Sequence, residues 1–574
     1  MRKLCTTLGA LLWLIAPNPV ASATEIFAVG GEGSGLGWEE AAGSAPVIDF
    51  TARPGWILPG NVAPNTNIAL ETYGRGGRVT SPNAHTVLRL NREDLGDLLR
   101  NIVDGDNQTA FEVKNVVATG ILLVIDLGAR FGVNHIRFFP RPSFSNDFLK
   151  GYALSINDGV FGADLIASSF AKLPDQSLFS QIAQDTGNKR DTVNVRFPLQ
   201  YVRYIRLEST QRFNWEIDEL EIFGRGFVPE ASYVSEIFDF DQPAIWGRLS
   251  WAAEHQGQPE SSRLAISTRS GNSRSPEDAP EDWSPWSSPY KSSNTQVRSP
   301  APRRYFQFKV DFASDGLEDG VGLDSLAFEV SRPALADSVI GEIWPQDVSV
   351  GDTTFTYAVR VVNARGFDRL EIDTSAPVEA VRSVRLDDRA LDFVATTGAR
   401  GLVLEFAGQS GTHRLEVVFD TAVLRYETVF AGRLIDRRVE ALPQEIVEGD
   451  ASTELPGDDL SVRMPLTRRL INRIEASPNP FTPNGDGVND RTVVAYDLLH
   501  LTRTAPVFLA VYDLAGNRLA QLTRQEATSG RFSYSWDGRD ADSRLLPPGL
   551  YAIQIEVETD VGTERRSSAI TIAY

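Results

Sequence analysis

Short apolar runs alternate with turn residues along nearly the whole chain from Val47 onward. The runs recur about every ten residues with Gly, Pro, Asn and Asp between them, which is typical of strands joined by tight turns. Asn91–Ile102 is the best segment for a short amphipathic helix. The pattern predicts an all-β protein, built as a multi-domain chain of β-sandwiches.

Shifts in composition divide the predicted strands into modules. A Gly-rich stretch at 24–46 is expected to be an irregular lead-in. An acidic, Pro-containing stretch at 437–473 is expected to be a semi-extended linker, with an added strand left open. We expect β-sandwiches at 47–228, 229–333 and 334–436, and an Ig-type module at 474–574. The strand count of 334–436 is typical of an immunoglobulin-like domain.

The first residues have the pattern of a secretory signal peptide. A basic pair, a short apolar stretch and a small-residue cleavage site follow one another as Arg2-Lys3, Leu8–Ala16 and Ala21-Ser22-Ala23. A membrane anchor is disfavoured because the apolar stretch is short and is interrupted by Pro17 and Pro19. We expect a signal peptide at 1–23, no transmembrane span in the mature chain, and a protein that is secreted or at the cell surface.

Cysteine content and charge narrow the function further. Cys5 is the only cysteine and lies within the signal, so we expect a mature chain without disulfides or thiolate metal sites. This favours a bacterial exported protein. The net charge of −20 argues against nucleic acid as a partner, because nucleic-acid binding needs a basic face.

The last hundred residues carry an ordered set of motifs. They are P-N-P-F within Ser477–Asp490, V-Y-D-L-A-G-N-R-L at Val511–Leu519, Y-S-W-D-G-R-D at Tyr534–Asp540 and L-P-P-G-L-Y-A-I-Q-I at Leu546–Ile555. This combination resembles the FlgD-like immunoglobulin-type C-terminal module of bacterial exported proteins. The resemblance implies a module for export or envelope attachment that does no chemistry.

The opening of this module contains Asn484-Gly485-Asp486-Gly487 followed by Asp490. Alternating oxygen side chains and glycines are found in Ca²⁺ loops. The EF-hand pattern fails, however, because Val488 and Ala495 stand where ligands belong. We therefore predict a structural turn whose Asn and Asp side chains cap the backbone.

A second ordered set of motifs lies between Val47 and Gly226. It comprises I-V-D-G-D-N-Q-T-A-F (Ile102–Phe111), L-L-V-I-D-L-G (Leu122–Gly128), V-N-H-I-R-F-F-P (Val133–Pro140), Y-V-R-Y-I-R-L-E (Tyr201–Glu208) and W-E-I-D-E-L-E-I-F-G (Trp215–Gly224). The set resembles the discoidin, or coagulation factor 5/8 type C, modules of the galactose-binding-like superfamily. It departs from them at Phe111, where Trp is commoner, and in a long insertion around Ser169–Lys189. The resemblance implies a jelly-roll sandwich, a fold in which many members bind glycans through loops at one end.

The same resemblance suggests a metal site. In the family a Ca²⁺ often sits at the loop that corresponds to Asp104-Gly105-Asp106, together with a Glu from the last strand, which here is Glu219. Asp104, Asp106, Thr109 and Glu219 would supply the hard oxygen ligands that Ca²⁺ prefers. The alternative is an Asx-type turn closed by its own side chains.

Three aromatic residues are candidates for contact with a ligand. Phe144, Phe148 and Phe213 stand beside Pro142, Asn146 and Asn214, so we expect them on loops. Exposed aromatics on such loops serve as stacking platforms for sugars, whereas most aromatics of a β-sandwich belong to the core.

Two further features indicate structure rather than chemistry. Trp283-Ser284-Pro285-Trp286-Ser287 matches the W-S-x-W-S motif, whose tryptophans stack with arginines, here drawn from Arg263, Arg269, Arg303 and Arg304. The five histidines, His85, His135, His255, His413 and His500, are scattered singly. No H-E-x-x-H, G-x-S-x-G or P-loop motif is present, so the sequence predicts a protein that is not an enzyme.

The sequence thus predicts an exported bacterial multi-module binding protein. Its discoidin-like domain would recognise a glycan or a cell-surface ligand, and its FlgD-like module would serve export or envelope attachment. The alternative is a purely structural envelope or assembly protein without glycan binding. Exposed aromatics on the loops of 47–226 would favour the first interpretation, and a flat, polar loop end the second.

Overall fold

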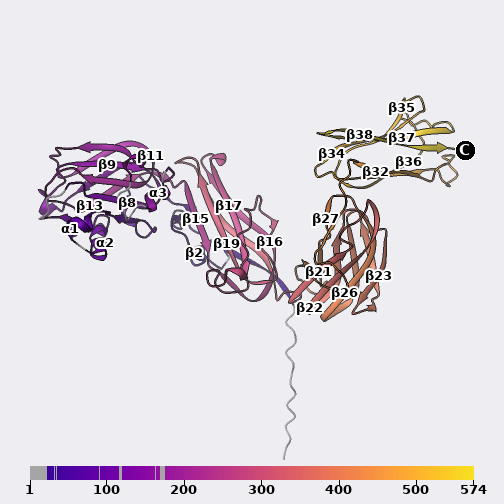
Figure 1. Ribbon diagram of the computed structural model, residues 1–574, viewed down its shortest axis with the longest axis horizontal. Helices are drawn as coiled ribbons and strands as arrows, with labels where there is room; N and C mark the ends of the chain where they lie inside the picture. Colours follow the sequence, from indigo (N-terminus) through magenta and orange to yellow (C-terminus); the bar gives the residue numbers. More distant parts are fainter. Residues whose placement is uncertain are drawn as a thin grey trace, which may run out of the picture. The chain divides into compact units, whose positions relative to one another are not determined.

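The computed structural model describes residues 22–574 except 32, 34, 90, 115–118, 162 and 169–174. The predicted signal peptide, up to residue 21, and Cys5 lie outside the described residues. Strands make up most of the regular structure, so the all-β prediction is confirmed (Figure 1). No described helix is long and apolar enough to span a membrane. The chain divides into two compact units, one holding residues 25–241 and 246–330, the other mainly residues 331–574.

The N-terminal domain, residues 47–228, contains a six-stranded antiparallel sheet. Its strands are β10 (Ser180–Asp185), β9 (Tyr152–Asn157), β11 (Val193–Ser209), β8 (Leu122–Phe139) and β13 (Glu219–Gly224) in that order, with β6 (Arg78–Thr80) beside β8. Three strand pairs accompany this sheet: β7 (Phe111–Val113) with β12 (Trp215–Ile217), β3 (Ile48–Asp49) with β4 (Leu58–Pro59), and β5 (Asn61–Val62) with β14 (Gly226–Phe227). On the β7–β12 pair, the rings of Phe111 and Trp215 have centroids 5.7 Å apart and are buried in the core.

Short helices connect the strands of this domain. They are η1 (Ile68–Glu71), α1 (Ala84–Leu88), α2 (Arg92–Arg100), η2 (Pro142–Phe144), α3 (Ala163–Ser168) and η3 (Gln176–Leu178). The predicted helix at Asn91–Ile102 is α2, which begins one residue later because Asn91 is its N-cap and accepts a hydrogen bond from the N–H of Asp94 at 2.8 Å. The helix is shorter than predicted at both ends, but it lies within the predicted range.

Strand β8 decides where the loops of this domain lie. It pairs antiparallel with β11, from Val193 opposite Phe138 to Glu208 opposite Leu122. Residues 122–127 are buried on both faces, which explains their continuous apolar run. The segment that follows β8 therefore lies beside the beginning of β11, at one end of the domain.

The second domain is built on an eight-stranded sheet. Its order is β1 (Ala23–Gly30), β20 (Gly320–Arg332), β16 (Phe238–Gln256), β19 (Arg303–Ser314), β15 (Glu230–Ser235) and β2 (Ala42–Ser44), with β17 (Ser262–Gly271) beside β19 and β18 (Thr295–Gln296) beside β16. The expectation of an irregular lead-in at 24–46 is therefore wrong for β1 and β2. Trp38 between them is buried and donates its indole N–H to the carbonyl of Asp324 at 2.8 Å, so the segment closes this sheet despite its glycines.

The W-S-P-W-S segment of this domain has a structural role. The guanidinium of Arg269 lies 4.5 Å from the ring centroid of Trp286 and 5.2 Å from that of Trp283. Trp283 is buried and donates its indole N–H to the carbonyl of Ser273 at 3.0 Å. Arg263 and Arg304 instead form ion pairs with aspartates. Arg269 thus fixes the loop that carries both tryptophans against the strand.

The third domain is a nine-stranded sheet dominated by two strands of 23 residues, β22 (Gly351–Asp373) and β26 (Gly401–Val423). The order is β24 (Arg389–Ala390), β23 (Ala380–Leu386), β26, β22, β21 (Ser338–Trp344) and β30 (Val447–Glu448). Strand β25 (Phe393–Gly398) pairs with β26, β28 (Gly432–Ile435) with β22, and β29 (Gln444–Glu445) with β28, while β27 (Glu427–Val429) and β31 (Ser461–Arg463) form a separate pair.

The stretch 437–473 is not the linker that its composition predicts. It supplies β29, β30 and β31, and the side chains of Ile446, Leu460, Val462 and Met464 are buried in the core of the third domain. Leu460, Val462 and Met464 alternate with Ser461 and Arg463, but this short pattern lies in a stretch whose average composition is acidic and polar. The third domain therefore extends well beyond residue 436.

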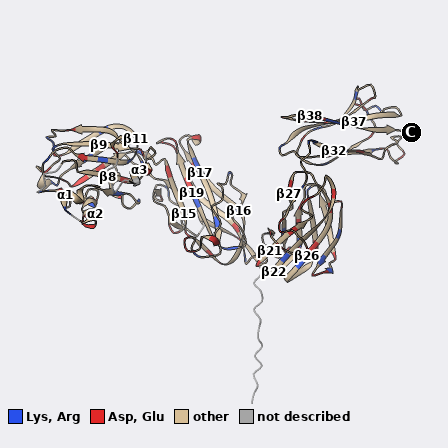
Figure 2. Ribbon diagram, in the orientation of Figure 1, with Lys and Arg blue, Asp and Glu red and all other residues tan. Residues whose placement is uncertain are grey.

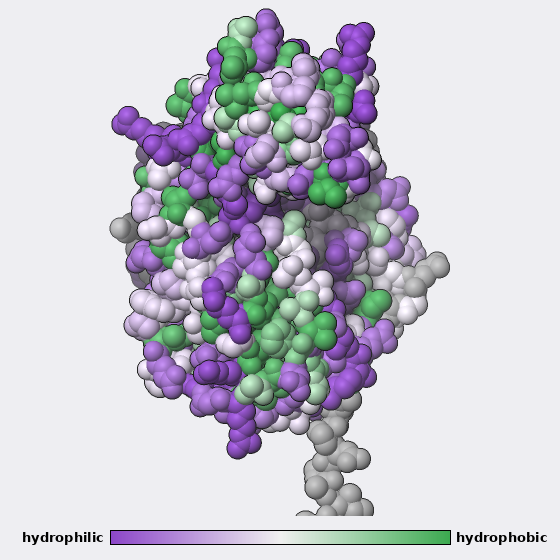
Figure 3. All heavy atoms as spheres, turned by 90° about the vertical axis from the view of Figure 1, so that its right-hand side faces the viewer, coloured by the Kyte–Doolittle hydropathy of each residue, from purple (hydrophilic) through white to green (hydrophobic). Residues whose placement is uncertain are grey.

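One face of the third domain carries half-buried and exposed apolar side chains. Figure 3, viewed from the side on which β23 lies in Figure 1, shows a patch of apolar atoms surrounded by hydrophilic ones. Val381 and Phe393 are partly buried against the core, and Val394 is 65% exposed. Charged residues of both signs are interspersed along the strands of every module (Figure 2).

A histidine in this domain gives a testable pH dependence. His413 on β26 has its Nδ1 2.8 Å from Asp387 Oδ2 and its Nε2 2.8 Å from the carbonyl of Ser410. Burial opposes protonation of the ring, but these two acceptors outweigh it and raise the pKa of His413. The resulting stabilisation is fully present below the ordinary pKa and is lost as the pH rises through the raised one.

Replacing His413 by glutamine should therefore cost more stability at pH 5.5 than at pH 8.5, by roughly 0.5–1 kcal/mol for a partly exposed pair. Hydrogen exchange of third-domain peptides, compared between variant and wild type at each pH, measures the difference. Asp387→Asn should make the cost of His413→Gln the same at both values. An equal cost in the unmodified background would contradict the assignment.

The C-terminal module contains two sheets. One has the order β32 (Ile471–Ser477), β33 (Thr492–Leu498) and β36 (Gly530–Trp536). The other has the order β35 (Arg518–Ala527), β34 (Ala505–Tyr512), β37 (Gly549–Thr559) and β38 (Gly562–Ile572). Their facing side chains form one core around Phe481, Tyr496 and Trp536. The first strand begins at Ile471, three residues before the expected boundary.

The turn at 484–490 is closed by its own side chains. The carboxylate of Asp490 accepts the N–H of Gly485 at 2.6 Å and that of Gly487 at 2.7 Å. Asp486 accepts the N–H of Val488 at 2.7 Å and Asn484 that of Asp486 at 3.0 Å. The acidic and amide oxygens cap the backbone, in the manner predicted for a structural turn.

Candidate ligand-binding surface

Three loops meet at the end of the N-terminal domain where β8 finishes. They are residues 140–151, 186–192 and 210–216. Backbone hydrogen bonds join them: Glu216 N–H to Asp147 O at 2.7 Å, Asn188 N–H to Lys150 O at 2.9 Å, and Thr210 N–H to Gly151 O at 2.9 Å. The loops that carry Phe144, Phe148 and Phe213 are thus neighbours, although up to seventy residues separate them in the chain.

The three candidate aromatics differ in how open their rings are. Phe144 is 43% exposed, but the guanidinium of Arg141 and Nζ of Lys114 lie 4.5 and 4.3 Å from its ring centroid. Phe148 is half-buried, with Lys150 Nζ 3.0 Å from its centroid. Phe213 is 55% exposed and has no ring or cation contact among the described residues. Phe213 therefore offers the most open aromatic face.

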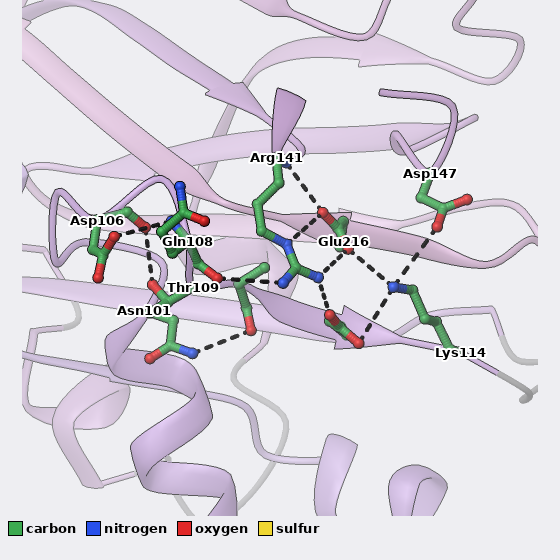
Figure 4. A network of polar contacts seen from close by, with 10 residues as sticks. Asn101, Asp106, Gln108, Thr109, Lys114, Arg141, Asp147 and Glu216 are labelled. Carbon is green, nitrogen blue, oxygen red and sulfur yellow. Dashed lines mark hydrogen bonds and ion pairs between the residues drawn. The ribbon is translucent and has the colours of Figure 1, made fainter. Parts of the chain in front are cut away.

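Figure 4 shows an ion-pair network around Glu216, and its cations Arg141 and Lys114 also contact the ring of Phe144. The side chain of Glu216 is 0% exposed and accepts hydrogen bonds from Arg141 Nε at 3.0 Å, Arg141 Nη2 at 2.8 Å and Lys114 Nζ at 3.2 Å. Burial opposes the ionisation of Glu216, but these donors outweigh it and lower the pKa of its carboxyl. Glu112 also pairs with Arg141, and Asp147 lies 3.8 Å from Lys114. The network fixes the 140–148 loop, and with it Phe144, to the strands below.

The predicted metal residues are brought together, and most of their oxygens close the turn. Asp104 Oδ1 accepts the N–H of Asp106 at 2.9 Å, and Asp104 Oδ2 accepts the Thr109 hydroxyl at 2.8 Å. Glu219 Oε1 accepts the N–H of Gly105 at 2.5 Å across 114 residues of sequence. The Asx-type turn that the sequence offered as an alternative is therefore formed, with Glu219 attached to it.

Two buried carboxyl groups at this turn have oxygens without partners. Glu219 is 3% exposed, and its Oε2 accepts no hydrogen bond from a described residue. Asp218 is fully buried, and its two carboxyl oxygens also lack a hydrogen-bond partner among the described residues. Burial raises the pKa of Glu219 to about 8 and that of Asp218 to about 6, and neighbouring carboxylates add to both shifts. Among the described residues no three Asp, Glu, His or Cys side chains are close enough to enclose a metal. The side chains of Asp104, Asp106, Thr109 and Glu219 offer oxygen atoms, which are the ligands that Ca²⁺ prefers. Glu219 Oε2 would be the ligand atom that is not already used in a hydrogen bond.

A polar cleft beside these loops was not foreseen from the sequence. It has a volume of about 310 Å³ and is lined by Tyr152, Asp185, Gly187, Asn188, Lys189, Arg190, Val193 and Asn194. Asn188 is buried and shapes the wall, because its amide donates to the carbonyls of Leu149 at 2.8 Å and Arg190 at 2.9 Å. Burial and the charge of Asp185 raise the pKa of Tyr152, so its hydroxyl stays neutral. The cleft offers a hydroxyl, a carboxylate, amides and cations within one small volume.

Part of this cleft is built from β9 and from β10, which belongs to the insertion around 169–189. The only sequence signal was the density of Asp, Asn, Lys and Arg in 185–194. Such a stretch is also typical of an ordinary surface loop. Its contact with Tyr152 depends on the pairing of β10 with β9, in which Asp185 lies opposite Tyr152, and no local pattern indicates that register.

Comparison with known proteins identifies the C-terminal module. Residues 493–560 match the model of the FlgD Ig-like domain. The prediction of a FlgD-like module is confirmed. No curated protein matches the chain in sequence.

Solved structures similar to part of the chain include carbohydrate-binding modules. One is chitosan-binding module 1 of a chitosanase/glucanase from Paenibacillus sp. IK-5, with 14% identity over 28% of this chain and 100% of that chain, and a TM-score of 0.19. Another is the CBM32-5 module from Clostridium perfringens in complex with GalNAc-β-1,3-galactose, with 18% identity over 27% of this chain and 98% of that chain, and a TM-score of 0.20. The family match thus covers part of the C-terminal module.

Proposed function

We propose that this chain is an exported bacterial binding protein, secreted or held at the cell surface. Its discoidin-like domain recognises a glycan or a cell-surface ligand, and its FlgD-like module serves export or envelope attachment. The observation that carries the proposal is the meeting, at one end of the discoidin-like domain, of the polar cleft around Tyr152 with the loops that bear Phe144, Phe148 and Phe213.

The chemistry of this end suits a saccharide. A sugar presents hydroxyl groups that both donate and accept hydrogen bonds, together with apolar C–H faces. Asp185 and Arg190 supply an acceptor and a donor at the cleft, and the 55% exposed ring of Phe213 supplies an apolar surface nearby. The exposed aromatics favour ligand binding over the purely structural alternative. We assign the site binding without a catalytic step.

Replacing Phe213 by alanine should weaken binding to the recognised polysaccharide by about tenfold, which corresponds to a loss of about 1.4 kcal/mol of stacking. The double variant Asp185→Asn, Arg190→Gln should weaken it at least as much, because it removes the charge from two cleft groups. Affinity is measured with the full chain on immobilised polysaccharides and a glycan array.

Phe161→Ala is the matched control. Phe161 is 70% exposed. Tyr152 begins β9 and Phe161 comes after its last residue, at the opposite end of the strand. Replacing Phe161 should therefore leave the affinity unchanged. An equal effect of Phe161→Ala would move the ligand away from the proposed surface. Failure of the full chain to bind any polysaccharide or cell-wall preparation at millimolar concentration would favour the assembly role instead.

A further inference from the structure

A buried glutamate in the third domain has one oxygen without a partner. Glu342 lies on β21 and is 0% exposed. Its Oε1 accepts the N–H groups of Ala451 at 3.1 Å and Ser452 at 2.5 Å. Its Oε2 has no hydrogen-bond partner among the described residues. Glu342 thus holds the acidic segment that follows β30, but only half of its carboxyl group is used.

The free oxygen points toward the other side of that segment. A methyl group built on Gly457 would lie 3.4 Å from Glu342 Oε2 and 3.1 Å from Gln346 Nε2. Glycine at this position therefore keeps space open next to Oε2. Gln346 Nε2 donates a hydrogen bond to Asp459 Oδ1 at 3.0 Å, and no hydrogen bond joins it to Glu342 Oε2.

Two exposed aspartates flank this space. Asp450 precedes Ala451, whose N–H binds Glu342, and Asp458 follows Gly457. Neither aspartate forms a hydrogen bond or an ion pair through its side chain within the described part of the chain. Burial, reinforced by the charges of these two aspartates, raises the pKa of Glu342 despite its two backbone donors.

Neither protonation state of Glu342 satisfies its free oxygen. An ionised Oε2 would be buried without a donor, and a protonated one would be an O–H group without an acceptor among the described residues. Leaving a buried polar group unpaired destabilises a protein, and a charged group more than a neutral one. A hard cation resolves both problems, because it binds the ionised oxygen directly and offsets the charges of the neighbouring carboxylates.

We propose that Glu342, Asp450 and Asp458 form a site for a divalent, oxygen-seeking cation, for which Ca²⁺ is the probe. Ca²⁺ accepts six to eight oxygen ligands in flexible geometry and completes its shell with carbonyls and water, which suits one buried and two exposed carboxylates. No three acidic side chains are gathered in the described structure, so the two aspartates turn toward Oε2 when the ion binds. The ion then fastens the segment 448–459 to β21.

Equilibrium dialysis of Ca²⁺ against the full chain tests the site. All variants carry Glu219→Gln, so that the acidic turn of the discoidin-like domain does not contribute. Glu342→Gln should bind one ion fewer per chain than the parent. The glutamine retains an oxygen that can accept from Ala451 and Ser452, and unchanged hydrogen exchange of β21 in chelator shows that the domain is folded.

Two double variants, each of which removes two negative charges, test whether Asp450 and Asp458 bind the ion. Asp450→Asn with Asp458→Asn should weaken Ca²⁺ binding at least tenfold. Asp392→Asn with Asp560→Asn removes the same charge from two other exposed positions and should leave the affinity within twofold of the parent. Equal numbers of bound ions in the parent and in Glu342→Gln would overturn the proposal, and so would equal weakening by the two double variants.

Discussion

Replacing Arg141 by methionine should destabilise the discoidin-like domain by about 3–5 kcal/mol, the range for removing one partner of a buried ion pair. Arg141 makes two side-chain hydrogen bonds to Glu216, whose side chain is 0% exposed, and a third comes from its own backbone N–H at 3.1 Å. Methionine preserves much of the side-chain volume but leaves Lys114 as the one cationic partner of the carboxylate among the described residues. Hydrogen exchange of peptides from 140–151 and 210–217 should show the loss of protection.

A more exposed pair on the same sheet provides the comparison. Arg137 and Glu221 form an ion pair between β8 and β13, with side chains 38% and 17% exposed. Arg137→Met should lower the stability of the domain by no more than about 1 kcal/mol, because water can solvate the carboxylate of Glu221 once its partner is removed. Adding Glu216→Gln to Arg141→Met should recover part of the stability, since it removes the uncompensated charge. An Arg141→Met variant as stable as Arg137→Met would show that Glu216 does not depend on Arg141.

The sequence predicted the strands well because their signal is local. Alternation and tight turns fix a strand within a few residues, as at the turn formed by Asp490, and the N-cap at Asn91 fixes a helix start. The segments 24–46 and 437–473 were misjudged for one common reason. Their average composition hid short apolar signals, because Trp38 stands among glycines and the alternation around Val462 lies in an acidic stretch, and the burial of both residues depends on pairing with other parts of the chain.

The candidate site was predictable only where a family resemblance bridged the sequence. It linked Glu219 to the acidic turn at Asp104, and the hydrogen bond from Gly105 to Glu219 shows that they meet. The ion pair of Arg141 with Glu216 and the cleft at Tyr152 were missed. Both depend on how three loops pack together, and charged residues in loops give no pattern that distinguishes a partner from solvent.

Calcium at a hundred times its dissociation constant should stabilise the discoidin-like domain by about 2.7 kcal/mol, if the ion binds only the folded state. Glu219 supplies the open ligand oxygen, and its pKa of about 8 means that the ion displaces a proton at neutral pH. The stabilisation should therefore increase from pH 6 to pH 8.5. Hydrogen exchange of peptides from 102–111 and 215–224, with and without Ca²⁺, measures it apart from any ion at Glu342.

The same pKa predicts the opposite trend in chelator. A carboxyl group whose pKa is raised on folding contributes stability that is fully present below its unfolded value near 4.5 and is lost as the pH rises through about 8. Without calcium, wild type should therefore lose protection relative to Glu219→Gln between pH 5 and pH 8.5, at about 1.4 kcal/mol per pH unit at most. With calcium, the protection of wild type relative to Glu219→Gln should increase over the same pH range. Protection that is the same with excess Ca²⁺ and with chelator would remove calcium from this turn, and the decline in chelator would remain as the signature of a buried, protonated glutamate.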